Sequence, residues 1–366
     1  MINVVISGIN FTSGGPLSVM RDFLIEINHK QGVNVVALVN SVNLYPVNQL
    51  GNISFIEFPK SKSSWLFRLW YEYFYFRRLS ESLGCDIWIS MHDITPVVHA
   101  KYLVTYCHNP SPFCDFDYKY FRFDKKFAAF NLFYRYLYRI NVKSNDFVVV
   151  QQHWMKAAFE KLLPVREVVV ARPSISEIIV NASDDKIDRI PTFVFPAFPR
   201  VFKNFEVICK AADLVSQNFP NVDFNVLITI DGSENDYSRW IVDKYSRLRC
   251  LKFIGLRSRD EVYEIYRNSD ALIFPSKLET WGLPITEYRQ FDKPIFCSDL
   301  PYARETSAGY NKVKYFNPDD YRGLAKLMLS LIRGERLDFD IADSACDGIS
   351  GWAEFFEYVL MRFKTR

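Results

Sequence analysis

The chain has 366 residues, of which 49% are hydrophobic and 24% are charged, an ordinary balance for a globular protein long enough to form two domains. Its formal net charge of +3 gives no argument for a nucleic-acid partner. The seven cysteines are scattered and form no Cys-x-x-Cys pair, which favours reduced thiols in a cytoplasmic protein over disulfides or a zinc site. No apolar run approaches the roughly 20 residues of a membrane-spanning helix, so we expect a protein that is soluble or lies on a membrane surface.

Short apolar runs alternate with longer helical or loop stretches along the first part of the chain, and each run predicts a strand. The first run lacks the basic segment of a signal peptide and ends at Gly8, after only seven residues. This short run is typical of a first strand. The strands expected here cover residues 2–7, 34–39, 53–58, 86–90, 102–107, 147–151 and 167–170. The polar segment 183–189 that follows is expected to be a linker.

The alternation then restarts, and the break near 173–190 divides it into two parts. The later strands are expected at residues 192–196, 224–230, 251–254, 270–274, 294–297 and 313–316. Repeated β–α alternation predicts parallel sheets covered by helices on both faces. We therefore predict an α/β protein with a first domain over 1–172, a second over 190–345 and a final amphipathic helix within 351–366.

Two glycines, Gly14 and Gly15, stand between the first predicted strand and a helical run from Leu17 to Ile27. The loop lacks Gly-x-Gly-x-x-Gly spacing, and no acidic residue is placed about 20 positions further on, so a nicotinamide site is not supported. A plain strand-to-helix turn and a functional loop remain alternatives.

Two carboxylates eight positions apart, Glu279 and Glu287, enclose a Gly-Leu-Pro turn that follows the apolar run 270–274. This pattern predicts a strand, a loop and a helix N-terminus, where free amides and the helix dipole favour a phosphate beyond the strand's carboxyl end. A carboxylate beside such a site can accept hydrogen bonds from hydroxyl groups. Phosphate and sugar hydroxyls together indicate a nucleotide sugar.

The spacing of these carboxylates resembles the E-x7-E signature of retaining glycosyltransferases with the GT-B fold, glycosyltransferase family 4 in particular. Further blocks resemble the family's in the same order: 148–156, 203–205, 253–255, 266–270 and 293–299. The resemblance implies two Rossmann-like, doubly wound domains facing a central cleft. It places the acceptor on the first domain and the nucleotide sugar on the second, with the C-terminal helix crossing back onto the first.

The resemblance also implies roles for residues of the E-x7-E region. Glu287 would bind ribose hydroxyls of the nucleotide, and Glu279 would bind the transferred sugar. The backbone amides of Trp281, Gly282 and Leu283 would face the phosphate, with Trp281 standing where the family usually has phenylalanine. These residues form the expected donor site.

A cation is expected beside the leaving diphosphate, because a fixed charge there stabilises the transition state more than the bound substrate. Lys203, which opens the first helix of the second domain, is the first candidate. The family usually has Gly-Arg at the positions of Ala197 and Phe198. Arg200 either replaces that arginine in the donor site or is a surface residue. By the same resemblance, Gly14 and Gly15 would lie near the donor phosphate or the acceptor.

Three histidines follow predicted strands. The resemblance favours His108 as a catalytic residue near the transferred sugar, followed by His92 and then His153. A structural histidine is the alternative at each position. No histidine pair has zinc spacing, and we expect no metal and no other cofactor.

Aromatic residues make up 16% of the chain and are concentrated in two stretches, 65–78 and 116–139. The second stretch contains six basic residues: Lys119, Arg122, Lys125, Lys126, Arg135 and Arg139. Rings and cations together suit a membrane interface with anionic lipid. The alternative is a packed helix pair in which arginine stems lie along aromatic faces.

These patterns lead to the expectation of a metal-independent hexosyltransferase that retains anomeric configuration. Its donor would be a UDP, GDP or dTDP sugar carrying a hexosyl or deoxyhexosyl unit. Its acceptor would be a glycan, lipid-linked, in bacterial surface polysaccharide synthesis (O-antigen or capsule), in the cytoplasm or on the inner face of its membrane. The alternative is a non-catalytic GT-B protein that binds sugars or a membrane surface. A nucleotide-sugar epimerase or dehydrogenase is disfavoured because the dinucleotide fingerprint is missing.

Overall fold

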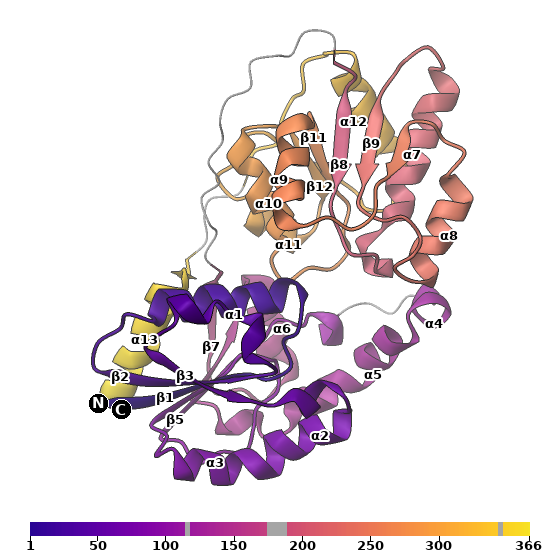
Figure 1. Cartoon of the computed structure of the whole chain (residues 1–366). Helices are drawn as coiled ribbons and strands as arrows, with labels where there is room; N and C mark the ends of the chain where they lie inside the picture. The colour runs from indigo at the N-terminus through magenta and orange to yellow at the C-terminus, as the bar shows by residue number, and fades with distance from the viewer. Residues whose placement is uncertain (114–117, 174–188, 343–346) are drawn as a thin grey trace. The chain divides into compact units, whose positions relative to one another are not determined.

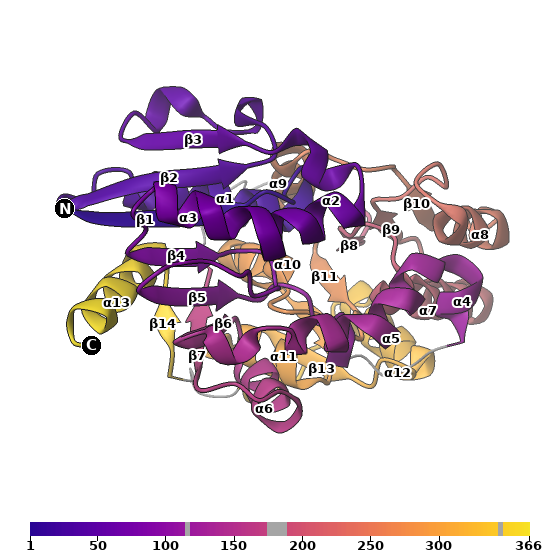
Figure 2. The same cartoon turned by 90° about the horizontal axis from the view of Figure 1, so that it is seen from below.

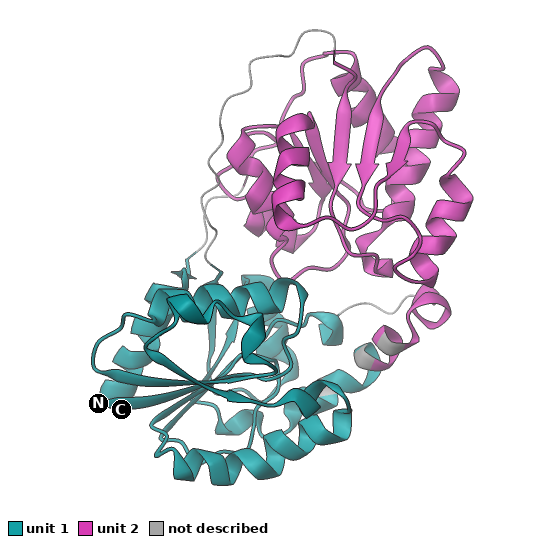
Figure 3. Cartoon of the chain, viewed as in Figure 1, with its two compact units in different colours: residues 1–113, 130–174, 347–366 teal, residues 114–129, 175–346 magenta. Residues whose placement is uncertain are grey.

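The computed structural model describes residues 1–113, 118–173, 189–342 and 347–366. They form two compact units (Figures 1 and 3). Unit 1 contains 1–113, 130–173 and 347–366, and unit 2 contains 118–129 and 189–342. Each predicted strand is confirmed, and the structure adds one short strand near the C-terminus. The linker expected over 183–189 lies outside the described residues except for Arg189.

Unit 1 is built on an eight-stranded sheet with the order β14-β7-β6-β5-β4-β1-β2-β3, in which every pair is parallel (Figure 2). The strands are β1 (Ile2–Gly8), β2 (Val33–Val39), β3 (Ile53–Glu57), β4 (Ile87–Ser90), β5 (Tyr102–Tyr106), β6 (Phe147–Val150), β7 (Val168–Arg172) and β14 (Ile349–Ser350). The chain winds outward from β1 in one direction and then in the other. Such doubly wound sheets bind ligands where the direction changes, here beyond the ends of β1 and β4.

Both faces of this sheet are covered because neighbouring residues of a strand point to opposite sides. Val4 and Ile6 pack in a core with α1 (Gly14–Ile27) and α13 (Trp352–Lys364), whereas Val5 packs on the other face with Phe76. That second face is covered by α2 (Trp65–Trp70), a π-helical turn (Tyr71–Tyr75), α3 (Phe76–Ser82), α5 (Lys125–Arg139) and α6 (His153–Leu162).

The C-terminal helix α13 belongs to unit 1, where it lies beside α1 (Figure 1). The ring of Phe23 in α1 lies 5.3 Å from that of Trp352 and 5.7 Å from that of Phe355, between centroids. Arg362 donates to both carboxylate oxygens of Glu167 at 2.9 and 2.7 Å. The last residues of the chain therefore complete the core of its first unit.

Unit 2 is built on a six-stranded parallel sheet with the order β10-β9-β8-β11-β12-β13. Its strands are β8 (Thr192–Phe195), β9 (Asn225–Ile228), β10 (Leu251–Phe253), β11 (Ala271–Phe274), β12 (Ile295–Ser298) and β13 (Val313–Phe316). Its helices are α4 (Lys119–Phe123), α7 (Phe205–Asn218), α8 (Asp236–Tyr245), α9 (Arg259–Asn268), α10 (Leu283–Tyr288), α11 (Pro301–Thr306) and α12 (Tyr321–Ile332). The direction of winding changes between β8 and β11, so this sheet has a ligand-binding edge of its own.

Residues 118–129 group with unit 2, whereas the sequence analysis placed them in the first domain. The reason is aromatic packing: the ring of Phe123 lies 5.2 Å from that of Trp240, and the ring of Phe127 lies 5.1 Å from that of Phe202. Within the described ranges, no helix is both long and apolar enough to cross a bilayer.

Candidate functional site

The candidate donor site of unit 2 lies at the carboxyl ends of β8 and β11. These two strands are parallel neighbours, with Phe193 opposite Ala271 and Val194 opposite Leu272. The segment after β8 carries Lys203, and the loop after β11 carries Glu279. Both side chains therefore project from the edge at which a doubly wound sheet binds its ligands.

Lys203 and Glu279 form an ion pair, with 2.5 Å between Lys203 Nζ and Glu279 Oε1. Both side chains are largely buried, and the ammonium group also lies 5.6 Å from the centroid of the Phe274 ring. A partly buried pair orders both long side chains. The structure thus brings together the expected cation and the expected sugar-binding carboxylate, which are 76 residues apart in the sequence.

Hydrogen bonds tie the loops that carry this pair. The amide of Lys277 donates to the carbonyl of Phe202 at 2.7 Å, and Asn204 Nδ2 donates to the carbonyls of Pro275 and Pro318 at 3.2 and 2.7 Å. Asn204 has a φ of 59°, a left-handed conformation that asparagine tolerates better than most residues. The sequence analysis included Asn204 in the block 203–205 but gave it no role, although an asparagine immediately before a helix is itself a signal of special backbone geometry.

The turn into α10 requires a glycine. Gly282 has a φ of 88°, a left-handed conformation that residues with a Cβ atom rarely adopt. On its other side the loop is held by α11, because Tyr302 donates to the carbonyl of Ser276 at 2.6 Å and Thr306 donates to that of Trp281. The Trp281 side chain is buried. The segment from Ser276 to Leu283 is therefore fixed at both ends.

Glu287 lies on α10, where its carboxylate faces residues of α9. Its oxygens lie 3.5 Å from the hydroxyl groups of Tyr263 and Tyr266, and 3.5 Å from Nη2 of Arg259. Burial raises the pKa of Glu287, while Arg259 and the two tyrosines oppose that rise. The sequence analysis missed these three neighbours, which no spacing in the sequence links to Glu287.

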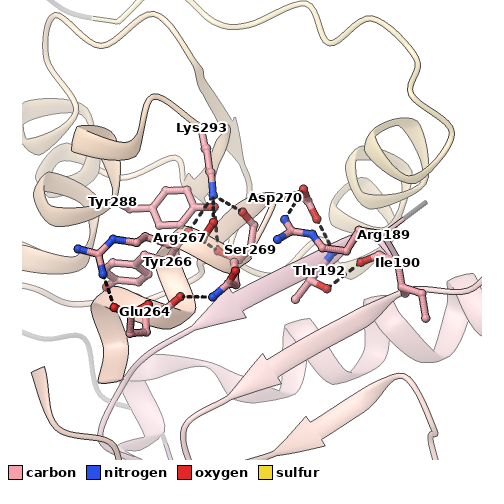
Figure 4. Close-up of polar contacts among 11 residues, drawn as sticks. Arg189, Ile190, Thr192, Glu264, Tyr266, Arg267, Ser269, Asp270, Tyr288 and Lys293 are labelled. Carbon is pink, nitrogen blue, oxygen red and sulfur yellow. Dashed lines mark hydrogen bonds and ion pairs between the residues drawn. The ribbon is translucent and has the colours of Figure 1, made fainter. Parts of the chain in front are cut away.

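Tyr266 is held in place by a lysine that caps α9 (Figure 4). Lys293 Nζ donates to the backbone carbonyls of Tyr266, Arg267 and Ser269 at 2.9, 2.7 and 2.7 Å. A cation at a helix C-terminus satisfies carbonyls that have no partner within the helix and complements the helix dipole. Lys293 thereby supports the helix whose tyrosines face Glu287.

Arg200 lies elsewhere in unit 2. It forms an ion pair with Asp124, and its guanidinium carbon lies 5.5 Å from the centroid of the Phe198 ring. The structure thus pairs Arg200 with the segment 118–129 and pairs Glu279 with Lys203. The sequence expectation that Arg200 replaces the family's arginine stays a prediction.

The candidates of unit 1 lie at the corresponding edge of its own sheet. Gly14, with a φ of 72°, and Gly15 are exposed at the start of α1, directly beyond β1. His108 follows β5, and its backbone amide donates to Asp93 Oδ1 at 2.6 Å. Its Nδ1 lies 3.3 Å from Nε2 of Gln151, and burial lowers the pKa of the imidazole to about 3. The imidazole is therefore neutral near pH 7.

Comparisons with known proteins agree with this arrangement. Residues 188–345 match the family model described as "Glycosyl transferases group 1". An uncharacterised glycosyltransferase of Methanocaldococcus jannaschii is 25% identical over 206 residues, which cover 56% of this chain and 54% of that protein. The match thus spans about half the length of this relative.

Solved structures extend the likeness to the whole chain. The lipopolysaccharide outer core galactosyltransferase WaaB in its apo form has a TM-score of 0.64 at 13% identity, covering 99% of both chains. Anabaena HepE in complex with UDP-glucose has a TM-score of 0.64 at 13% identity, covering 91% of this chain and 90% of HepE. The chain has the GT-B fold, with one Rossmann-like sheet in each unit.

The residues that match this family model, 188–345, include every donor-site candidate of unit 2, whereas Gly14, Gly15 and His108 lie outside the match. Two Asp-x-Asp pairs occur in the sequence, at 115/117 and 338/340. The first pair lies outside the described residues, and Asp340 accepts from Lys314 Nζ and from the amide of Tyr315 at 2.8 and 2.7 Å.

A buried polar cluster lies beneath the edge of the unit 1 sheet. Nε2 of His92 lies 3.0 Å from Ser7 Oγ and 3.2 Å from Glu72 Oε1. Arg68 Nη2 donates to the backbone carbonyl of His92 at 2.8 Å and lies 3.4 Å from its Nδ1. All four side chains are buried. The sequence analysis ranked His92 second among the histidines but treated Arg68 and Glu72 only as members of an aromatic stretch.

Burial dominates the protonation of this cluster. It raises the pKa of Glu72 to about 8, with Arg68 opposing, and it lowers the pKa of His92 well below its usual value. Near pH 7 the cluster therefore contains a protonated carboxyl group, a neutral imidazole and one guanidinium cation. Buried polar groups of this kind stabilise a structure only while their hydrogen bonds are satisfied.

Replacing Glu72 by glutamine is expected to remove a pH dependence of stability. A carboxyl group whose pKa is higher in the folded state stabilises it below the unfolded pKa and loses that contribution as pH rises through the folded value. Because the folded pKa is about 8, the wild type should lose roughly 1 kcal/mol of stability between pH 7 and pH 9. Urea unfolding at pH 7, 8 and 9 measures the free energy of unfolding and its change with pH.

The control is Glu81→Gln, which changes an exposed residue on α3 and should show the pH dependence of the wild type. Identical pH dependence in wild type and Glu72→Gln would refute the buried-acid assignment.

Proposed function

We propose that the protein is a retaining glycosyltransferase of the E-x7-E type, glycosyltransferase family 4. It transfers a hexosyl or deoxyhexosyl unit from a UDP, GDP or dTDP sugar to a glycan acceptor, without a metal or other cofactor. The observation that carries the proposal is the Lys203–Glu279 pair at the switch point of a group 1 domain, with Glu287 on the following helix.

Each residue of unit 2 has a chemical task in this proposal. Lys203 neutralises charge on the leaving diphosphate, and the amides of the turn around Gly282 bind phosphate oxygens. Glu279 accepts hydrogen bonds from hydroxyl groups of the transferred sugar, and Glu287 accepts from the ribose. Donor binding breaks the Lys203–Glu279 pair by supplying a phosphate to the lysine and hydroxyl groups to the carboxylate.

Transfer with retention proceeds on one face of the sugar. The acceptor oxygen forms a bond to the anomeric carbon while the bond from that carbon to the β-phosphate oxygen breaks. The acceptor's proton passes to the departing phosphate. His108, neutral because of its burial, donates or accepts a hydrogen bond near the sugar, and positioning and electrostatics supply most of the acceleration.

The acceptor in this proposal is a lipid-linked glycan of bacterial surface polysaccharide, O-antigen or capsule, and unit 1 holds it near Gly14 and Gly15. The proposal has two supports among proteins of this fold: WaaB, a lipopolysaccharide outer core galactosyltransferase, and HepE, solved with UDP-glucose. The protein then acts in the cytoplasm, against the inner face of the cytoplasmic membrane.

Nucleotide binding tests the donor half of this proposal. UDP, GDP and dTDP are each titrated while thermal unfolding is followed, since a ligand that binds only the folded state raises its stability with concentration. One nucleotide should raise the melting temperature more than the other two. Hydrolysis of the matching sugar nucleotide, with and without acceptor extract, then tests catalysis. The absence of a shift with all three nucleotides would refute the proposed donor class.

A non-catalytic GT-B protein that binds sugars or a membrane surface is the second candidate. It is favoured by Phe198, which stands where the family has an arginine, and by the pairing of Arg200 with Asp124. Nucleotide binding without hydrolysis or transfer, at any acceptor concentration, is the result expected of this second candidate.

A further inference from the structure

Two helical stretches of unit 1 present large apolar side chains to solvent at the same spacing. In α2 and the π-helical turn these are Leu66, Phe67, Trp70 and Phe74. In α5 they are Leu132, Phe133 and Tyr136, and Ile140 follows directly after the helix. The spacing i, i+1, i+4, i+8 places each set on one side of a helix. Leu66 is 78% exposed, Phe74 69% and Phe133 64%. Scattered exposed hydrophobic residues are ordinary, but two aligned sets are not.

Both sets point away from the same face of the unit 1 sheet. Phe76 of α3 belongs to the same hydrophobic cluster as Leu103 of β5, and Tyr134 of α5 belongs to the cluster that contains Cys107. Leu103 and Cys107 are four residues apart and therefore point to the same face of the sheet. The helices are joined through Trp65, whose ring lies 6.1 Å from that of Tyr134. Their inner sides fill the core, and the exposed apolar side chains on their outer sides are here called the α2–α5 surface.

The exposed charge around the α2–α5 surface is mainly positive, and the exposed carboxylate on α3, Glu81, lies 3.0 Å from Nε2 of His99. Exposed basic side chains lie in the same segments: Lys60, Lys62, Arg77, Arg78, Arg139 and Lys143. Residues 59–80 and 130–144 contain one acidic residue, Glu72, which is fully buried against His92. The ammonium group of Lys60 also lies 5.9 Å from the centroid of the exposed Phe67 ring. Cations therefore border the apolar side chains, and no carboxylate in these two segments is exposed.

We propose that the α2–α5 surface binds an anionic lipid bilayer, with the rings and leucines entering the headgroup region and the basic residues contacting lipid phosphates. Amphipathic helices lie in the interface in this way, and each basic residue near the surface adds electrostatic attraction. The purpose of this surface rests on the proposed function. A lipid-linked acceptor lies in a membrane, and membrane binding would bring unit 1 to it.

A second copy of the chain fits this surface less well than a bilayer. Two copies meeting face to face would bring their basic residues together, and like charges at an interface oppose association. A membrane supplies the opposite charge along with an apolar layer. Dimer formation is nevertheless included among the outcomes of the test.

Binding of the full chain to lipid vesicles tests the proposal. Sedimentation with vesicles of phosphatidylglycerol and phosphatidylcholine is compared with sedimentation with pure phosphatidylcholine, at increasing salt. We expect binding to the anionic vesicles that weakens as salt rises, because ions screen exposed charges. The variant Leu66→Ser/Phe133→Ser should lower the partition coefficient at least about tenfold, since two apolar side chains no longer leave water. The matched control is Leu256→Ser/Ile341→Ser, which changes two exposed residues of unit 2 and should bind as the wild type does.

Three results would overturn the proposal. The first is equal sedimentation with anionic and neutral vesicles, and the second is an equal loss of binding in the two double variants. The third is a dimer, seen by analytical ultracentrifugation, that Leu66→Ser/Phe133→Ser dissociates while wild-type vesicle binding is absent. Nucleotide-induced thermal stabilisation, measured on the same samples, reports separately on the donor site. Vesicle binding without any nucleotide-induced stabilisation would refute the proposed function and leave the membrane inference standing. Nucleotide-induced stabilisation without vesicle binding would refute the membrane inference and leave the proposed function standing.

Discussion

Replacing Lys203 by alanine is expected to lower the turnover of sugar transfer by two to three orders of magnitude, with a smaller change in the KM for the donor. Removing one fixed donor that stabilises developing charge typically costs about this much, and Lys203 is the candidate cation that the structure places against Glu279. Charge grows on the diphosphate only as the glycosidic bond breaks, so the loss falls on kcat more than on KM. Steady-state kinetics with the nucleotide sugar identified by thermal shift measures both constants.

Two further variants separate the role of this lysine from that of its neighbours. Lys203→Arg keeps the charge and should retain more activity than Lys203→Ala. Arg200→Ala removes the cation that pairs with Asp124, and it should reduce kcat strongly only if Arg200 replaces the family's arginine. Wild-type turnover in Lys203→Ala would refute the assignment and leave Arg200 as the cation to examine.

Glu287→Ala is expected to weaken nucleotide binding by about ten- to a hundredfold, which corresponds to the roughly 1.5–3 kcal/mol of a charged hydrogen bond. Burial raises the pKa of Glu287, and the ionised carboxylate is the better acceptor for ribose hydroxyls. Affinity in the wild type should therefore fall as pH decreases through that raised pKa, and this dependence should vanish in the variant. Isothermal calorimetry across pH 4–8 measures both effects.

The control for Glu287 is Glu264→Ala, an exposed carboxylate on the neighbouring helix α9. It should bind nucleotide as the wild type does, because it lies on the solvent side of that helix. Unchanged affinity in Glu287→Ala would place the ribose elsewhere. The side chain would then serve only to anchor α10 to Tyr263 and Tyr266.

The strands of both sheets could be predicted from the sequence because a parallel strand that is buried on both faces consists of a continuous run of apolar residues. Ala271–Phe274 and Ile295–Ser298 are of this kind, with all their residues buried. Glu279 and Glu287 could be predicted as site residues for another reason. They lie on either side of the turn at Gly282, whose positive φ favours glycine, so the local geometry of this turn fixes their spacing along the chain.

The partners of these residues could not be read from the sequence, since they depend on where distant segments meet. Arg200 pairs with Asp124, 76 positions away, and Glu72 faces His92 across the same unit. The grouping of 118–129 with unit 2 has the same origin. Local spacing carries no information on such contacts, and burial, which decides the pKa of Glu72, follows from them.

The position of α13 has a consequence for the order in which the protein folds during synthesis. The ribosome releases the chain from the N-terminus onward, and domains generally fold as they emerge. The strands of unit 2 are consecutive in the sequence and emerge together, whereas Trp352 and Phe355, which pack against Phe23, are synthesised more than 300 residues after it. Unit 1 is therefore the first unit to begin folding and the last to complete its core. A nascent chain stopped before α13 would leave Phe23 uncovered, and such an open core is a binding site for a chaperone.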